Sequence, residues 1–404
     1  MMRRKALSRR GFVAGAAAGA ALLGAPAARA GVEEIRIGSI CPYSGPASAY
    51  GVIGQVQAAW FRKVNDGGGV NGRPVRFISR DDAYNPARAL EQTRRLVESD
   101  GVLAVFNPLG APSNTAIRQY LNDRRTPQLF VASGATKWGD WRNYPWTISG
   151  QPSYQAEAQV YARLMLERTP AGRIGVLYQN DDFGRDYLKG LAGGLGDRAE
   201  RMIVAREPYE TGDATVDGRL LALKAAGADV AFIVATPKFA AQAIRRMAET
   251  GWRPERYLVS VSQTVAGVMR PAGLANGAGV ISSYYLKDPA DPAWRDDPAM
   301  AELNAFLDRY LPGADRNDIL VVYGYVLGQL LTHVLERCGD ELTRDNLMRQ
   351  ATSIRELRLG LLLPGVTIST GPQDYFPFKQ LQPLQFDGER WRPLGGVVAT
   401  EARL

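Results

Sequence analysis

The sequence predicts an α/β protein with doubly wound parallel sheets. Short apolar runs rich in Val, Ile, Leu and Phe alternate with stretches of helical periodicity along the chain. The apolar runs are nearly continuous, which is typical of strands buried on both faces of a parallel sheet. The chain has 404 residues, and the part that follows an N-terminal segment is long enough for two lobes with separate cores.

Six apolar runs are predicted as strands, and segments between them as helices. The strands are expected at 34–40, 75–79, 102–106, 127–132, 173–179 and 229–235. The clearest helix is expected within 85–101, where Pro86 suits the first turn and Gly101 follows the end. Residues 216–228 and 238–251 repeat this arrangement. Strand, helix and strand in this order indicate parallel sheets covered by helices.

The first 30 residues have the pattern of an export signal. Arg9 and Arg10 in "SRRGF" precede an uncharged Ala/Gly-rich stretch, and Ala28-Arg29-Ala30 forms an A-x-A cleavage site. Paired arginines before a weakly hydrophobic core are typical of twin-arginine signals. The uncharged stretch is shorter than the roughly 18–20 apolar residues that a membrane span needs, and we expect no span later in the chain.

Removal of this segment leaves an almost neutral chain. The segment holds six of the 49 Lys and Arg and none of the 41 Asp and Glu, so 43 basic and 41 acidic side chains remain. This balance predicts no nucleic-acid partner. Cys41 and Cys338 are the two cysteines. They could pair in an oxidising compartment, but a body of this size does not need a disulfide, so their pairing stays open.

The loops that follow the predicted strands are candidates for a ligand site, because open α/β sheets bind ligands outside the carboxyl ends of their strands. A helix N-terminus beside a hydroxyl group suits a carboxylate. For each loop alone, ordinary turn and capping chemistry is the alternative, with Ser113 and Asn114 as caps. Five loops combine Gly or Pro with hydroxyl or aromatic side chains: 41–51, 107–114, 133–141, 180–187 and 236–239.

Other motifs indicate no catalytic or metal site. The glycines of 67–72 satisfy G-x-G-x-x-G but precede a strand, the reverse of the dinucleotide-binding order, so we expect a helix stop and a turn. His333 is the only histidine, and its apolar helical face favours a packed or capped ring. A single histidine does not support a zinc cluster, and the acids of 180–187 lack calcium-loop spacing. We therefore expect no enzyme activity, metal or cofactor.

Four longer segments carry a family resemblance. They are "IRIGSICPYSGPASAYG", "NDGGGVNGRPVRFISRDDAYNPARALEQTRRLV", "GRIGVLYQNDDFGRDYLKGL" and "ATPKFAAQAIRRMAETGW". Together they resemble the solute-binding proteins of branched-chain amino-acid-type ABC transporters, the Leu/Ile/Val-binding family. The resemblance covers essentially the whole chain after the export signal.

The resemblance implies a type I periplasmic binding fold, in which two doubly wound lobes are joined by three crossovers. The crossovers are expected near 147–154, 281–288 and 361–369. The implied division is an export signal at 1–30, lobe I at 31–150 plus 284–361, and lobe II at 151–283 plus 362–404.

The resemblance also implies which residues contact the ligand. In the family, the first lobe binds the ligand carboxylate with backbone amides and hydroxyl groups, and the family tyrosine and threonine fall on Tyr50 and Thr136. A family serine falls on Ala111, a departure that leaves backbone amides and Ser113. The aromatic residue of the second lobe falls on Phe183. The expected ligand-binding set is Tyr50, Leu109, Gly110, Ala111, Ser113, Ser133, Gly134, Ala135, Thr136, Tyr154, Phe183, Thr236 and Ser262.

A second departure bears on the ligand. The glutamate that binds the α-ammonium group in amino-acid binders falls within 257–267, "YLVSVSQTVAG", which contains no acid. A buried ammonium group without a carboxylate costs several kcal/mol. Unless another acid substitutes, the ligand is expected to be an aromatic or aliphatic carboxylate or an amide. The alternative is a shifted alignment in this loop, with a branched-chain amino acid as ligand.

The implied function is the periplasmic solute-binding component of an ABC importer. It would close its lobes on a small, partly apolar carboxylate and deliver it, as a monomer, to membrane permease subunits. The alternative is a ligand sensor of the same fold that signals to a membrane receptor.

Overall fold

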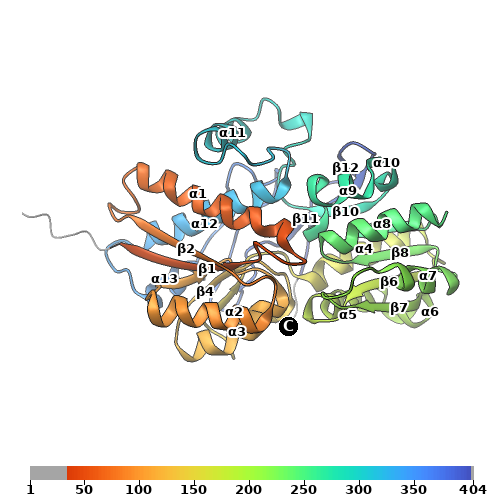
Figure 1. Cartoon of the computed structure of the whole chain (residues 1–404), viewed down its shortest axis with the longest axis horizontal. Coiled ribbons are helices and arrows are strands. Elements are labelled where there is room, and N and C mark those ends of the chain that lie inside the picture. The colour runs from red at the N-terminus through yellow and green to blue at the C-terminus, as the bar shows by residue number, and fades with distance from the viewer. Residues whose placement is uncertain (1–33, 402–404) are drawn as a thin grey trace, which may run out of the picture.

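The computed structural model describes residues 34–401. It consists of two α/β bodies that lie side by side along the long axis of the molecule (Figure 1). We call the body built on strands β1–β5 lobe I and the body built on strands β6–β13 lobe II. The twin-arginine signal predicted at 1–30 lies outside the described residues and stays a prediction.

Within residues 34–401, lobe I contains a five-stranded sheet in the order β2-β1-β3-β4-β5, and its neighbouring strands are parallel. The first four predicted strands are confirmed as β1–β4. The elements are β1 (Ile35–Cys41), α1 (Gly51–Asp66), β2 (Val75–Asp81), α2 (Pro86–Arg94), β3 (Ala104–Phe106), α3 (Ala111–Asp123), β4 (Gln128–Val131), η3 (Thr136–Gly139), β5 (Thr147–Ser149), α11 (Pro298–Tyr310), α12 (Ile319–Cys338) and α13 (Arg344–Ala351).

In the same described range, lobe II has a sheet in the order β12-β11-β10-β9-β8-β6-β7, with β13 paired to β11. Strands β6–β10 are parallel, and the two predicted strands are confirmed as β6 and β8. The elements are α4 (Tyr154–Arg168), β6 (Ile174–Gln179), α5 (Asp182–Leu195), α6 (Ala199–Met202), β7 (Ile203–Tyr209), α7 (Asp217–Ala225), β8 (Val230–Val234), α8 (Pro237–Glu249), β9 (Glu255–Leu258), α9 (Arg270–Ala272), α10 (Leu274–Gly277), β10 (Ile281–Tyr284), β11 (Gln380–Phe386), β12 (Trp391–Pro393) and β13 (Val398–Ala399).

The last three strands, which were not predicted, depart from the parallel pairing of the core. Strand β11 is antiparallel to β10, and β12 and β13 are antiparallel to β11. No helix of lobe II separates β11 from β12; instead Asp387 accepts hydrogen bonds from the backbone N–H groups of Glu389 and Arg390 and closes a tight turn. The Asp-Gly pair at this turn is a hairpin signal that the sequence contains.

A side-chain cap starts helix α2, which follows strand β2. Asn85, the residue before Pro86, accepts hydrogen bonds from the N–H groups of Ala87 and Arg88. The helix predicted within 85–101 is confirmed, although its last turn, Arg95–Ser99, is a π-turn. The glycine run after α1 forms the predicted helix stop and turn, with positive φ at Gly68 and Gly69.

Helix α12 overturns the prediction that no later segment could span a membrane. It is 20 residues long with a mean hydropathy of 1.4, enough for a span by length and composition, yet most of it is buried inside the protein. It packs against α1, where the indole N–H of Trp60 donates to the hydroxyl of Thr332 (2.9 Å). Its composition is that of a core helix, because most of its surface is covered by the rest of the protein.

The two cysteines are both buried and unpaired in the structure. Burial raises the pKa of the Cys41 thiol to about 12 and that of Cys338 to about 11. Buried thiols of this kind react slowly.

Candidate functional site

A cavity lined by residues of both lobes lies between them. Its walls come from loops and first helical turns that follow β1–β6, β8 and β9, from the end of β10, and from the first turns of α12. Among the described residues that line it there is no Asp, Glu, Lys, Arg or His. Its aromatic side chains are Tyr50, Tyr84, Tyr154, Phe183, Tyr284, Tyr285 and Tyr323.

Tyr50 forms part of the lobe I wall at the start of α1. Its ring is 6% exposed, and its hydroxyl donates to the backbone carbonyl of Val261 in lobe II (3.1 Å). Tyr50, at the end of the loop 41–51 that was predicted as part of a ligand site, therefore lines the cavity. It also joins the two lobes. Tyr43 from the same turn does not line it, because its hydroxyl lies 2.5 Å from that of Ser79 on β2.

The first turn of α3 forms the neighbouring part of the lobe I wall. Leu109, Gly110 and Ala111 line the cavity. Gly110 is the N-cap, and no side chain caps the helix. The first-turn N–H groups of a helix have no partner within the helix, so this end of α3 favours an anion. Gly110 has φ of 92°, and a Cβ at this position would lie 2.3 Å from the ring of Tyr84.

Ser113, expected at the ligand, instead supports the turn that carries Tyr84. Its hydroxyl donates to Asp82 (2.5 Å), and Asp82 accepts the backbone N–H of Tyr84 (3.0 Å). Ala83 and Tyr84 both have positive φ, 50° and 59°, a conformation that non-glycine residues adopt only when their surroundings impose it. Asp82 and Ser113 together supply that constraint.

Tyr154 and Phe183 form an aromatic wall on the lobe II side. Tyr154 begins α4, directly after the chain leaves lobe I, and Phe183 lies in the first turn of α5. Their ring centroids are 5.3 Å apart in an edge-to-face arrangement, and Tyr154 stacks on Tyr187 at 4.6 Å. Packing of this kind fixes the orientation of the rings and gives a rigid surface for an apolar group.

Thr236 and Ser260 are the polar side chains of lobe II in the cavity wall. Thr236 is the N-cap of α8, and its N–H donates to the hydroxyl of Tyr209 (3.0 Å). The backbone N–H and the hydroxyl of Ser260 both donate to the carboxylate of Glu157. Glu157 is 1% exposed; burial raises its pKa, and its hydrogen bonds oppose that shift.

Four further residues of the expected set lie beside the cavity without lining it. Ser133 accepts a hydrogen bond from the indole of Trp138 (3.1 Å). Gly134 lies against the ring of Tyr154, where a Cβ would approach to 2.6 Å. Ala135 is buried in the same apolar cluster as Tyr154. The hydroxyl of Ser262 donates to the carbonyl of Ala235 (2.6 Å). Their role in ligand binding stays a prediction.

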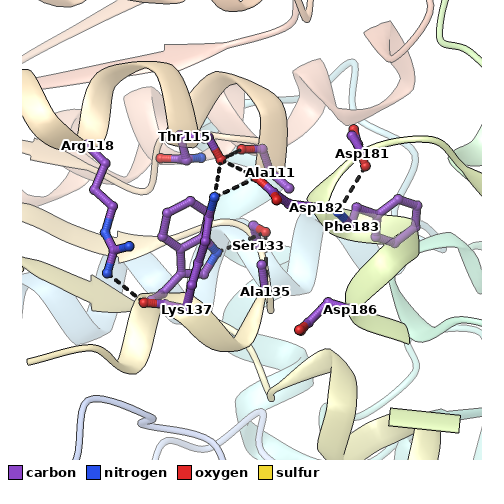
Figure 2. Close-up of polar contacts among 12 residues, drawn as sticks. Ala111, Thr115, Arg118, Ser133, Ala135, Lys137, Asp181, Asp182, Phe183 and Asp186 are labelled. Carbon is purple, nitrogen blue, oxygen red and sulfur yellow. Dashed lines mark hydrogen bonds and ion pairs between the residues drawn. The ribbon is translucent and has the colours of Figure 1, made fainter. Parts of the chain in front are cut away.

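Thr136 belongs to a set of polar contacts between the lobes. Its N–H and its hydroxyl both donate to Asp186 of α5, each at 2.8 Å. One turn earlier on α5, Asp182 accepts from Lys137 (2.5 Å) and from Thr115 (2.8 Å) of lobe I. Figure 2 shows the side chains of Thr115, Lys137 and Asp182 in mutual contact, because Lys137 also donates to Thr115 (2.7 Å). We call these five residues the inter-lobe latch.

Local electrostatics differ among the acids at the start of α5. Burial raises the pKa of Asp181, the N-cap of α5, to about 6. Burial opposes ionisation of Asp182 as well, but the hydrogen bond and charge of Lys137 outweigh it and lower the pKa of that carboxyl. Asp186 is half-buried, and burial raises its pKa against the hydrogen bonds from Gln155 and Thr136.

Several cavity residues were missed by the sequence analysis. Tyr284 and Tyr285 stand in "ISSYYLKD", which is predicted only as a crossover, and their place at a strand end could have drawn attention to them. Tyr323 is one of many apolar positions in α12 and carries no signal in the sequence. The residues missed are Ile53, Tyr84, Ala132, Gln151, Pro152, Ser260, Val261, Tyr284, Tyr285, Leu320 and Tyr323.

His333 lies well away from the cavity. Tyr323, which lines the cavity, is ten residues earlier on α12, a separation of about 15 Å along a helix. Within residues 34–401, no group of three or more His, Cys, Asp or Glu side chains gathers as a metal site.

The family assignment follows from the sequence of nearly the whole described chain. The model of the family described as periplasmic binding protein matches residues 34–376. The chain belongs to this family. The resemblance to Leu/Ile/Val-binding proteins is confirmed, and the family places such proteins outside the cytoplasm as binders of small solutes.

Curated relatives of this periplasmic binding protein include Leu/Ile/Val-binding protein homologues and a chemotactic substrate-binding protein. The chain is 27% identical over 196 residues to the chemotactic signal transduction system substrate-binding protein BasB of Halobacterium salinarum. The matched region covers 46% of each chain. The chain is 24% identical to Leu/Ile/Val-binding protein homolog 7 of Brucella abortus, over 63% of this chain and 65% of that protein. The matches thus span between about half and two-thirds of these relatives.

Solved structures confirm the type I periplasmic binding fold. A branched-chain amino acid ABC transporter protein from Thermus thermophilus with bound valine matches with a TM-score of 0.80 at 14% identity, over 91% of this chain and 97% of that one. A solute-binding protein from R. palustris in complex with benzoate matches with a TM-score of 0.75 at 18% identity, over 92% and 99%. At these identities the likeness establishes the fold of two parallel-sheet lobes.

Proposed function

We propose that this periplasmic binding protein is the solute-binding component of an ABC importer, and that it captures a small, partly apolar carboxylate or amide. The observation that carries the proposal is the aromatic cavity between the lobes, which no charged side chain lines. Capture would require both lobes, because the cavity walls come from both. Delivery to permease subunits, as a monomer and without chemical change of the ligand, belongs to the same proposal.

The proposed binding mode places the ligand carboxylate at the first turn of α3. The uncapped N–H groups there, beside Tyr50, would stabilise a negative charge without a basic side chain. The apolar part of the ligand would pack on Tyr154 and Phe183. Micromolar affinity corresponds to about 8 kcal/mol, which a few charge-assisted hydrogen bonds and one buried apolar group can supply.

The proposed ligand carries no ammonium group. The segment 257–267 contributes Ser260 and Val261 to the wall, and neither is acidic. An ammonium group here would lose its hydration without gaining a carboxylate contact. The valine and benzoate in the two related structures are ligands of those proteins; for this chain the uncharged wall supports the benzoate-like class.

The test is gentle purification and native mass spectrometry, followed by fluorescence titration with leucine, phenylalanine, benzoate, phenylacetate and benzamide. We expect saturable binding of an acid or amide that lacks an amine. Phe183→Ala should weaken that ligand about tenfold through lost aromatic packing, whereas Tyr310→Ala on α11, outside the cavity, should not. Tight leucine binding with no response to the amine-free compounds would refute the proposed ligand class.

Export through the twin-arginine route is part of the proposal and rests on the paired Arg9 and Arg10. Substitution of both by lysine should leave the protein in the cytoplasmic fraction. Recovery of the substituted protein in the periplasm would contradict this route.

A second candidate function is ligand sensing, which the similarity to the chemotactic protein BasB favours. The two functions separate in a deletion strain. Loss of uptake of the identified ligand supports the importer, and loss of taxis toward it with normal uptake supports the sensor.

A further inference from the structure

Ser260 lines the cavity, and its backbone N–H and its hydroxyl both contact Glu157, which does not line the cavity. Its backbone N–H donates to one carboxylate oxygen of Glu157 (2.8 Å), and its hydroxyl lies 2.6 Å from the other. The hydroxyls of Tyr161 and Tyr187 donate to the same carboxylate at 2.7 and 2.9 Å. Each carboxylate oxygen therefore has two hydrogen-bond partners, and these contacts oppose the rise in the pKa of Glu157 that its burial causes.

The alternative orientation of these hydroxyls is disfavoured by the cluster itself. A backbone N–H can only donate, which commits one oxygen of Glu157 as an acceptor. A buried phenol hydrogen needs an acceptor, and among the described residues Tyr187 has Glu157 as its hydrogen-bond partner. A separation of 2.6 Å is typical of a hydroxyl that donates to a carboxylate. The hydroxyl hydrogen of Ser260 thus points at Glu157, away from the cavity.

We propose that Ser260 is a specificity-determining residue whose hydroxyl oxygen only accepts hydrogen bonds in the cavity, so that the ligand carries an O–H or N–H group at this wall. Glu157 is the positioning residue that fixes this polarity. The inference rests on the proposed function and narrows its ligand class to hydroxy acids and amides. A keto or ether oxygen at the same place would face another acceptor and lose its hydrogen bond to water without replacement.

The test uses sets of acids that differ only in one group, measured by isothermal titration calorimetry. One set is mandelate, phenylglyoxylate and phenylacetate; a second is 2-hydroxy-4-methylpentanoate, 2-oxo-4-methylpentanoate and 4-methylpentanoate. A third compares the ring-hydroxylated benzoates with their methoxy counterparts and with benzoate. We expect at least one hydroxy acid to bind about tenfold or more tightly than both its oxo or methoxy partner and its unsubstituted partner.

Two variants test the role of the Glu157 cluster. Ser260→Ala should abolish the preference for the hydroxy acid. Glu157→Gln places an amide nitrogen where a carboxylate oxygen accepts from Ser260; that nitrogen donates to the serine, whose hydrogen then turns to the cavity, and the preference should shift toward the oxo or methoxy acid. Ser283→Ala is the matched control, because Ser283 contacts Tyr161 (2.9 Å) outside the cavity wall.

The outcomes separate the inference from the proposed function. If neither an acid of any set nor benzamide binds, the proposed ligand class fails, and the inference fails with it. If acids bind without preference for the hydroxyl, or if the preference survives Ser260→Ala, the inference alone is overturned. If Glu157→Gln does not fold, Ser260→Ala and Ser283→Ala still decide, because only the first should change the preference.

Discussion

Substitution of Asp186 by alanine should weaken ligand binding although Asp186 does not line the cavity. The carboxylate accepts two hydrogen bonds from Thr136 across the lobe boundary, each 2.8 Å long. These bonds exist only while the lobes are together, and a ligand that contacts both walls needs the same arrangement. Loss of the bonds therefore raises the free energy of the bound state relative to separated lobes.

The magnitude follows from the surroundings of Asp186. Hydrogen bonds to charged groups contribute about 1.5–3 kcal/mol when buried, and the half-buried position of Asp186 reduces this to about 1 kcal/mol each. Two bonds give about 2 kcal/mol, which corresponds to a Kd about 30-fold higher. We expect the full 30-fold increase in Kd if the lobes of the ligand-free protein are apart, because the two hydrogen bonds then form only when the ligand binds.

The assay is calorimetric titration of the identified ligand with the wild type, Asp186→Ala, Thr136→Val and the double variant. If Thr136 acts through Asp186, the two effects should not add; if Thr136 contacts the ligand as the family resemblance implies, they should add. Asp197→Ala, an exposed acid just beyond α5, is the matched control. An unchanged Kd for a folded Asp186→Ala protein would refute the role of the inter-lobe latch.

Three further substitutions test the site. Gly110→Ala should lower the free energy of unfolding by about 1–3 kcal/mol, because φ is 92° and Tyr84 blocks the Cβ; an unchanged urea midpoint would contradict this. Asp181→Asn should raise the melting temperature at pH 7.5 and have no such effect at pH 4. Burial raises the pKa of Asp181 to about 6. Ionisation of Asp181 therefore costs the folded state stability as the pH rises from about 4 to above 6, and asparagine removes that cost. Tyr50→Phe removes the hydrogen bond to Val261 and should raise Kd about fivefold through faster dissociation in stopped-flow fluorescence; an unchanged dissociation rate would argue against it.

The sequence was sufficient for the parallel core because buried strands and their helices are local patterns. Strands β1–β4, β6 and β8 lie where apolar runs predict them. The antiparallel strands β11–β13 were missed because β12 and β13 span only three and two residues, and β11 contains Pro383, which weakens a strand pattern. The connection from β10 to β11 contains α11, α12 and α13, yet the two strands pair antiparallel, so a helical connection did not reveal the direction of β11.

The loops of the site were predictable, and the roles of their hydroxyl groups were not. Parallel strands end at one edge of the sheet, so the loops after them meet at the cavity regardless of their sequence separation. A hydroxyl binds whichever acceptor lies near it in space. Ser113 binds Asp82 and Thr136 binds Asp186, partners 31 and 50 residues away, and no local pattern reveals such pairs. The positive φ of Tyr84 depends on the same distant contacts.

The first turns of α5 link ligand contact to contact between the lobes. Phe183 lines the cavity, while Asp182 and Asp186 on the same helix bind lobe I. Asp181 fixes the start of the helix by accepting the N–H group of Phe183 (2.9 Å). A ligand that packs on Phe183 therefore holds in place the same segment that carries both latch carboxylates. Because one rigid segment serves both contacts, a change in either should appear in the affinity for the ligand and in the equilibrium between joined and separated lobes.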